Sequence, residues 1–124
     1  MAGTTSGVKI SKNQCDTDII LYQGKTVNFS VIWGGDTPID VTGYSARLQA
    51  RETADAATAL VDLSNGSGIT VGTTDGLFTI SMSATDSAAV AAFVGVYDFE
   101  IEDSSGNVYL VMSGKFTCLA EVTK

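Results

Sequence analysis

The sequence predicts an all-β domain folded as an antiparallel β-sandwich, and two observations support this prediction. Hydrophobic and polar residues alternate in two-residue steps along much of the chain, which is the side-chain period of a β-strand. Thirteen glycines against one proline supply many turns, the usual punctuation of antiparallel β proteins. At 124 residues the chain has the length of one domain and is long enough to bury a hydrophobic core.

Individual strands follow from this alternation. In the clearest one, Val27, Phe29, Val31 and Trp33 share one face, while Asn28 and Ser30 occupy the other. Arg47 and Arg51 lie on the polar face of another strand, from which they can pair with an acidic strand. We expect strands at 17–22, 27–33, 44–51, 59–63, 69–71, 77–82, 94–102 and 108–122. The Asp75-Gly76 pair indicates a hairpin between two of them.

About seven to nine short strands at this spacing are typical of an immunoglobulin-like sandwich. A partly open barrel gives similar spacing, and the period alone does not separate the two architectures.

One stretch looks helical, because a Ser/Thr/Asp cluster that includes Asp86 precedes an alanine run. We therefore expect a short helix near residues 84–92. Residues 1–7 are expected to form a flexible N-terminal arm, and residues 8–124 a single immunoglobulin-like domain.

Charge and hydropathy limit the partners. The formal net charge is −7, and the chain has only seven Lys and Arg residues, so nucleic acid and anionic membranes are not expected as partners. No apolar run approaches the roughly 18 residues of a membrane-spanning helix. The N-terminal residues lack the basic and apolar regions of a signal peptide, so we expect a protein that is made in a cytoplasm and is not secreted by a signal peptide.

The residues that usually carry enzyme chemistry are scarce. Without histidine there is no His-based triad and no His metal site. No glycine run has the spacing of a phosphate-binding loop. Asp98, Glu100 and Glu102 follow the strand period and so line an exposed face, while 16–18 is interpreted as a turn whose side chains bond their own backbone. We therefore predict no catalytic residues, no cofactor and no metal.

Several residues are predicted to have structural roles. Trp33 is interpreted as a core residue, and the four tyrosines as mostly core-facing. Two cysteines lie near opposite ends of the chain, Cys15 and Cys118. A reducing cytoplasm favours free thiols, whereas first and last strands that are neighbours in a sandwich would allow a disulfide.

Five segments of the chain carry short, distinctive motifs: Pro38-Ile39-Asp40-Val41-Thr42-Gly43-Tyr44, the strand that follows to Arg51, Gly95-Val96-Tyr97-Asp98-Phe99-Glu100-Ile101, Gly114-Lys115 and Glu121-Val122-Thr123. These motifs resemble those of a virion protein of tailed bacteriophages, and they are similar to those of the N-terminal immunoglobulin-like domain of phage baseplate upper proteins. In the first segment Gly43 permits a bend that Asp40 and Thr42 stabilise through bonds to the backbone. Asp86 and Tyr97 resemble the corner in which a tyrosine hydroxyl ties a loop to the sheet.

The resemblance implies a structural protein of the virion, either a capsid decoration or a tail or baseplate component, that acts by docking on other virion proteins. The two locations in the particle are not separated by the sequence. An open sandwich also leaves unpaired strand edges, through which a homo-oligomer can form. The alternative is a generic binding module, such as an adhesin-like or carbohydrate-binding sandwich.

Overall fold

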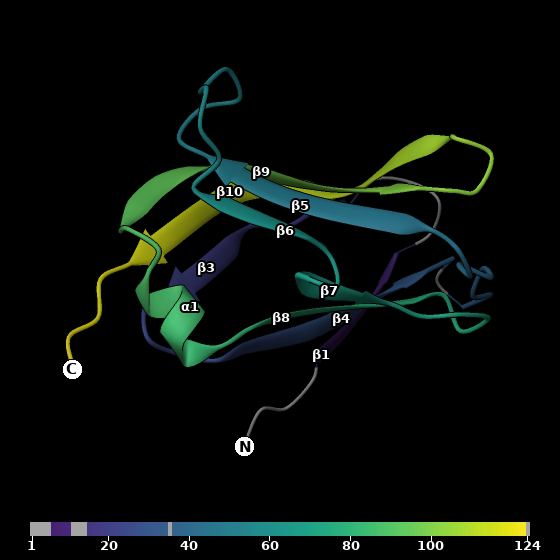
Figure 1. The fold of residues 1–124 in the computed structure, drawn as a ribbon, viewed down its shortest axis with the longest axis horizontal. Helices are drawn as coiled ribbons and strands as arrows, with labels where there is room; N and C mark the ends of the chain where they lie inside the picture. The colour runs from purple at the N-terminus through teal and green to yellow at the C-terminus, as the bar shows by residue number, and fades with distance from the viewer. Residues whose placement is uncertain (1–5, 11–14, 35, 124) are drawn as a thin grey trace.

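The computed structural model describes residues 6–10, 15–34 and 36–123, and these residues form two packed β-layers with one short helix. Figure 1 shows β5, β6, β9 and β10 in one layer and β1, β4, β7 and β8 in the other, with the helix at one end. In chain order the elements are β1 (Ser6–Ile10), β2 (Cys15–Asp16), β3 (Ile19–Tyr22), β4 (Val27–Trp33), β5 (Ser45–Arg51), β6 (Val61–Asn65), β7 (Gly68–Val71), β8 (Leu77–Met82), α1 (Ala84–Ala88), β9 (Phe93–Glu102) and β10 (Val108–Leu119).

Strand pairing is antiparallel within the body of each layer. One layer has the order β4-β8-β7, and the other has the order β6-β5-β9-β10. A short parallel pairing between β6 and β7 joins the layers at one corner, where Ser64 lies opposite Gly68. The N-terminal segment contributes to both layers, since β1 runs parallel to β4 whereas β2 and β3 run parallel to β10. Two packed, largely antiparallel layers of short strands agree with the predicted immunoglobulin-like sandwich.

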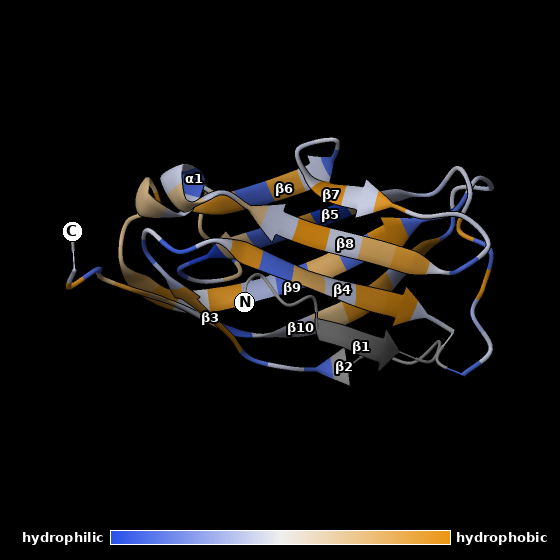
Figure 2. Ribbon diagram, turned by 90° about the horizontal axis from the view of Figure 1, so that it is seen from below, coloured by the Kyte–Doolittle hydropathy of each residue, from blue (hydrophilic) through white to orange (hydrophobic). Residues whose placement is uncertain are grey.

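The core lies between the layers and is filled by alternating inward-facing side chains. Figure 2 shows this alternation as changes of colour along β4. Trp33 is 1% exposed, and its ring centroid lies 5.9 Å from that of Tyr109, so its predicted core position is confirmed. Phe78 of β8 and Phe99 of β9 meet edge to face across the two layers, with centroids 5.8 Å apart.

Four features differ from the sequence-based expectation. The described residues contain ten strands, because two short N-terminal strands, β1 and β2, were not predicted. The helix ends at Ala88, so it covers the first half of the predicted range, and β10 ends at Leu119. Ser6 and Gly7 of the predicted N-terminal arm begin β1, whereas residues 1–5 of that arm lie outside the described residues. No helix in the described part of the chain is long and apolar enough to cross a membrane.

Candidate docking surface

The segment that leads into β3 is fixed to β10 by contacts between residues far apart in the sequence. The Thr17 N–H donates to the Ser113 carbonyl at 2.9 Å, and the Lys115 N–H donates to Asp18 Oδ1 at 2.9 Å. The Tyr97 hydroxyl of β9 donates to the Thr17 carbonyl. A Cβ on Gly114 would lie only 2.6 Å from that carbonyl oxygen, so glycine is required for this close approach.

These contacts correct one sequence-based interpretation, that of Asp18. Asp18 bonds the backbone of β10, 97 residues away, and not its own turn. The Tyr97 hydroxyl ties Thr17, a residue between β2 and β3, to the sheet, which is the kind of contact that the resemblance implies. Asp86 instead lies in the first turn of α1, where its N–H donates to the hydroxyl of Ser83, the N-cap residue.

The predicted bend before β5 is present. Asp40 Oδ1 accepts from the Thr42 N–H at 2.9 Å, and hydrogen bonds from the Thr42 side chain and backbone hold the pKa of Asp40 below its ordinary value of 3.8. Gly43 has a φ of +82°, a conformation that favours glycine. Pro38 is exposed in the loop before the bend. These residues therefore shape the turn that leads into β5.

The strand register places Cys15 and Cys118 at different levels along β10. Cys118 is a buried free thiol whose pKa is raised by burial. Cys15 pairs with Met112 on β10, six residues along the strand from Cys118. This separation corresponds to about 20 Å of strand, well beyond the Cα spacing that a disulfide spans.

The solvent-facing side of the β6-β5-β9-β10 layer, together with that of β3, is called the outer face. Along β9 the inward positions are buried and the outward positions are largely exposed. The outward side chains change character along the strand, from Val94 and Val96 at one end to Asp98, Glu100 and Glu102 at the other. The outer face is thus apolar at the end near α1 and polar at the opposite end.

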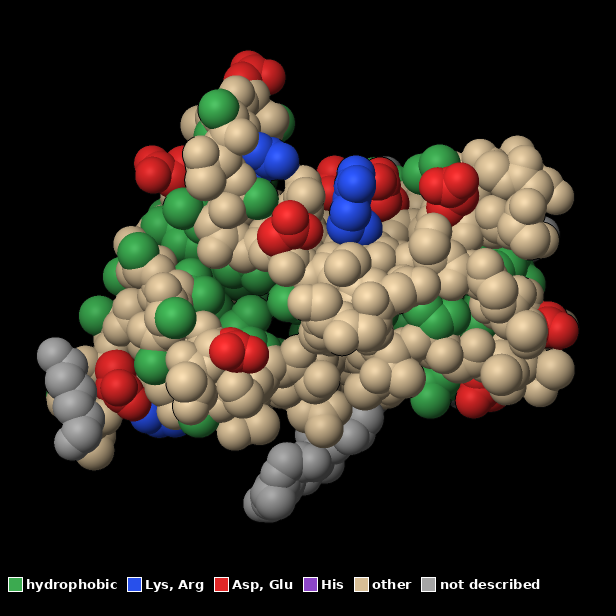
Figure 3. Space-filling model, viewed as in Figure 1, with side chains coloured by type: hydrophobic (Ala, Val, Ile, Leu, Met, Phe, Trp, Pro, Cys, Tyr) green, Lys and Arg blue, Asp and Glu red, His purple; other side chains and the backbone are tan. Residues whose placement is uncertain are grey.

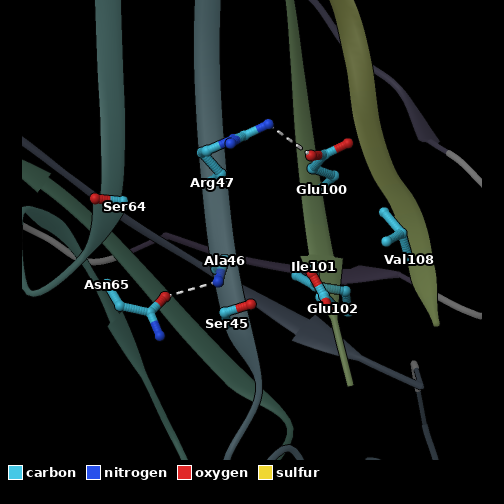
Figure 4. A pocket seen from close by; sticks show the side chains of 9 residues that line it. All are labelled: Ser45, Ala46, Arg47, Ser64, Asn65, Glu100, Ile101, Glu102 and Val108. Carbon is cyan, nitrogen blue, oxygen red and sulfur yellow. Dashed lines mark hydrogen bonds and ion pairs between the residues drawn. The ribbon is translucent and has the colours of Figure 1, made fainter. Parts of the chain in front are cut away.

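The polar end is hollowed, as Figure 4 shows. This polar hollow has a volume of about 390 Å³ and is lined by Ser45, Ala46, Arg47, Ser64, Asn65, Glu100, Ile101, Glu102 and Val108. Arg47 and Glu100 project from neighbouring strands, and their side chains form an ion pair of 3.2 Å. The predicted pairing of Arg47 with the acidic strand is confirmed, whereas Arg51 donates to Gln49 Oε1 and the Ala56 carbonyl.

Asn65 forms part of the wall of the polar hollow. Its Oδ1 accepts from the Ala46 N–H at 2.6 Å, and its Nδ2 donates to the Tyr44 carbonyl at 3.2 Å. The side chain thereby holds the last residue of β6 to the start of β5, at the point where the chain leaves for the other layer. The close-up shows this amide bonding Ala46 beside the Arg47–Glu100 pair (Figure 4).

Charge on the outer face is mixed but dominated by carboxylates. Figure 3 shows basic side chains flanked by acidic ones along the top of the molecule, over the layer that contains β5 and β9. The Arg47 side chain is 59% exposed and that of Glu100 is 36% exposed, so their ion pair contributes little to folding. The charges remain accessible to a partner. Among the described residues, no group of three or more acidic or thiol side chains is arranged to hold a metal ion.

The opposite end of the outer face carries exposed hydrophobic side chains, which we call the apolar strip. It comprises Ile20, Tyr22, Val94, Val96 and Leu119. This cluster was not predicted from the sequence. Tyr22, one of the tyrosines predicted to be mostly core-facing, is 55% exposed. The sequence does contain a sign of this cluster. Val94 and Val96 are separated from Asp98 by even numbers of residues, so they lie on the same outward face of β9 as Asp98.

The fold is that of an immunoglobulin-like β-sandwich domain, and its outer face carries the polar hollow and the apolar strip. No protein-family model matches the sequence, and no curated protein matches it. Among solved structures, the chain is similar to the N-terminal domain of phage TP901-1 ORF48, with a TM-score of 0.53 and 12% identity over 94% of this chain and 98% of that chain. It is also similar to a chicken TCR structure, with a TM-score of 0.54 and 14% identity over 89% of this chain, which spans 56% of that chain.

Proposed function

We propose that this chain is a non-enzymatic structural protein of a phage virion, a capsid decoration or a tail or baseplate component, that acts by docking on other virion proteins. The observation that supports this role best is the end-to-end likeness to a phage domain, which covers nearly all of both chains. The likeness is one of fold, and the docking role rests in addition on the outer face of this chain.

The polar hollow is the surface proposed to receive a virion partner. It offers a guanidinium, two carboxylates, hydroxyl groups and an amide within one depression, and Val108 beside them is 56% exposed. Such a mixture of polar groups around accessible apolar area is typical of non-obligate protein interfaces. The acidic excess on β9 favours a partner with basic side chains, for which association weakens as salt is added.

The virion role is tested by asking whether the protein is part of the particle. We expect the chain to co-purify with banded phage particles from the organism that carries its gene, at a fixed ratio to a major virion protein. Immunogold labelling would then place it on the head or on the tail. Recovery only in the soluble lysate, with particles lacking the chain, would contradict the proposal.

Variants then test the polar hollow itself. The gene for this chain is deleted from the phage, and the protein is supplied from a plasmid. The Glu102→Arg variant is then expected to be incorporated poorly into particles, because it reverses the charge of a carboxylate in the hollow. Asp55→Arg is the matched control, since Asp55 is an exposed acid in the loop that projects from the β5–β6 hairpin (Figure 1). Equal incorporation of both variants would exclude the hollow as the docking site.

A carbohydrate-binding module is the second candidate, and the amide, hydroxyl and carboxylate groups of the polar hollow favour it. None of the nine lining residues is aromatic, so the stacking platform that many sugar sites use would have to come from elsewhere. Chemical-shift changes at Ser45 and Asn65 on addition of a bacterial-surface glycan would support this candidate. Unchanged shifts across a panel of such glycans would speak against it.

A further inference from the structure

The apolar strip is one continuous surface although its residues come from three strands. Thr117 of β10 lies opposite both Val94 of β9 and Ile20 of β3. In the adjacent rows, Leu119 lies opposite Tyr22 and Lys115 lies opposite Val96. Directly opposite residues in paired strands project their side chains on the same face, so these rows form a single patch.

The exposure of this strip is too large for isolated surface hydrophobic residues. Val94 is 66% exposed, Ile20 and Tyr22 are each 55% exposed, and Val96 and Leu119 are 42% and 41% exposed. Together these side chains present on the order of 500 Å² of accessible surface, within the range of the largest patch on a typical monomer, which is often functional. The strip is therefore a candidate contact surface.

We propose that a second copy of this chain covers the apolar strip, with the two strips packed face to face about a two-fold axis. Two such strips would bury about 1,000 Å² in total, which is the lower limit for a specific interface. A two-fold contact needs one self-complementary surface, and an apolar patch meets this condition because dispersion and hydrophobic contacts have no donor or acceptor to match. This inference does not depend on the virion role.

The distribution of charge restricts how the two copies meet. Each copy carries a net charge of −7, so complete overlap of the two outer faces would bring carboxylates together. Lys115 of β10 and Arg51 of β5 each lie opposite Val96, so the charges in this row are basic. The exposed acids of β9 begin at Asp98, the next outward position after Val96, and continue away from the strip. Beside the strip, Lys25 and Glu121 compensate each other in an ion pair of 3.0 Å.

A two-fold axis that lies in the plane of the contact and perpendicular to β9 reduces this repulsion. It places the β9 strands of the two copies in opposite directions, so their acidic ends point away from each other. Overlap is then confined to the apolar end, and the polar hollow of each copy stays accessible. The residual repulsion between the two negative chains is long-range and is reduced by salt, so association should strengthen as salt is added.

Sedimentation velocity of the purified chain, from micromolar to submillimolar concentration, tests the proposal. We expect a monomer–dimer equilibrium that shifts toward dimer at higher salt. Val94→Lys and Ile20→Lys place a charge in the strip at exposed positions and should each weaken dimerisation by about tenfold or more. Thr70→Lys is the matched control, because Thr70 is an exposed strand residue of the opposite layer, and this variant should dimerise like the wild type.

Folding of each variant is verified by the urea midpoint, followed through the fluorescence of buried Trp33. A wild-type chain that stays monomeric at every concentration and salt would overturn the proposal. So would strip variants that are folded and dimerise as well as Thr70→Lys. A strip-dependent assembly other than a dimer would refute the two-fold arrangement. Incorporation into particles is a separate readout, so failure of the virion role and failure of the dimer are distinguishable.

Discussion

Replacing Tyr97 by phenylalanine removes one oxygen atom from a side chain that is 4% exposed. The ring remains able to pack edge to face against Phe116, whose centroid lies 6.2 Å away. What is lost is the hydrogen bond from the hydroxyl to the Thr17 carbonyl. Because this bond joins β9 to the segment between β2 and β3, its loss should loosen the N-terminal segment without opening a cavity in the core.

The expected size of the effect follows from the environment of the bond. A net intramolecular hydrogen bond is worth about 0.5–1.5 kcal/mol, and the donor is buried while Thr17 is only half-buried. We therefore expect Tyr97→Phe to lower the free energy of unfolding by about 1 kcal/mol, or Tm by about 4 °C for a domain of this length. Amide exchange in β3 should accelerate more than exchange in β8, since β3 is held by the lost contact.

Urea unfolding monitored by Trp33 fluorescence measures the free energy, and Tyr109→Phe is the matched control. The Tyr109 hydroxyl lies 3.4 Å from Asp103 Oδ2, which is long for a hydrogen bond, so this substitution should change the stability by less than about 0.5 kcal/mol. If Tyr97→Phe is no more destabilising than Tyr109→Phe, the hydroxyl does not anchor the N-terminal segment and the reasoning fails.

Three further outcomes are expected. Gly95→Ala should lower the free energy of unfolding by about 2–3 kcal/mol or prevent folding, because its Cβ would lie 2.1 Å from a backbone carbonyl oxygen. Gly43→Ala should lower it by only about 1 kcal/mol, because a Cβ there has nothing within 4 Å and the cost comes from the positive φ alone. Chemical denaturation of both variants checks this order. Hydrogen bonds from the Asn107 backbone and side chain lower the pKa of Asp103 below 3.8, so the stability it contributes is present above the unfolded pKa and is lost as pH falls through the folded value. As the pH is lowered, the urea midpoint of unfolding should therefore fall less steeply for Asp103→Asn than for the wild type. Equal pH dependence of the two midpoints would refute this coupling. In a Cys15→Ser background, the buried Cys118 thiol should react with an alkylating reagent at least about tenfold more slowly when folded than in urea, and equal rates would show that the thiol is accessible.

Much of the fold could be predicted from the sequence because its determinants are local. Alternation in β4 and β5 fixes which side chains face the core, and β8 has the predicted bounds, 77–82. The turns were equally predictable, since a carboxylate bonds the backbone two residues on. Asp75 Oδ1 accepts from the Leu77 N–H at 3.2 Å in this way, in the predicted hairpin. Such contacts depend only on neighbours in the chain.

The candidate surfaces could not be predicted in the same way, because they depend on which strands become neighbours. The polar hollow needs Arg47 and Glu100 side by side, although 53 residues separate them in the chain. The apolar strip needs Ile20 and Val94 on either side of Thr117. Alternation identifies the two faces of a strand but does not identify the partner strand, and it cannot tell which apolar face stays in water.

The amino-acid sequence by itself determined the strand period, the turns, the class of fold and the acidic charge of this protein. The tertiary structure alone decided that the N-terminal segment serves both layers, since Asp18 reaches Lys115 and Tyr97 reaches Thr17 across 97 and 80 residues. The physical reason is that hydrophobic periodicity and turn chemistry act over a few residues, whereas sheet order is settled by pairings distant in the chain that form only when the whole core closes.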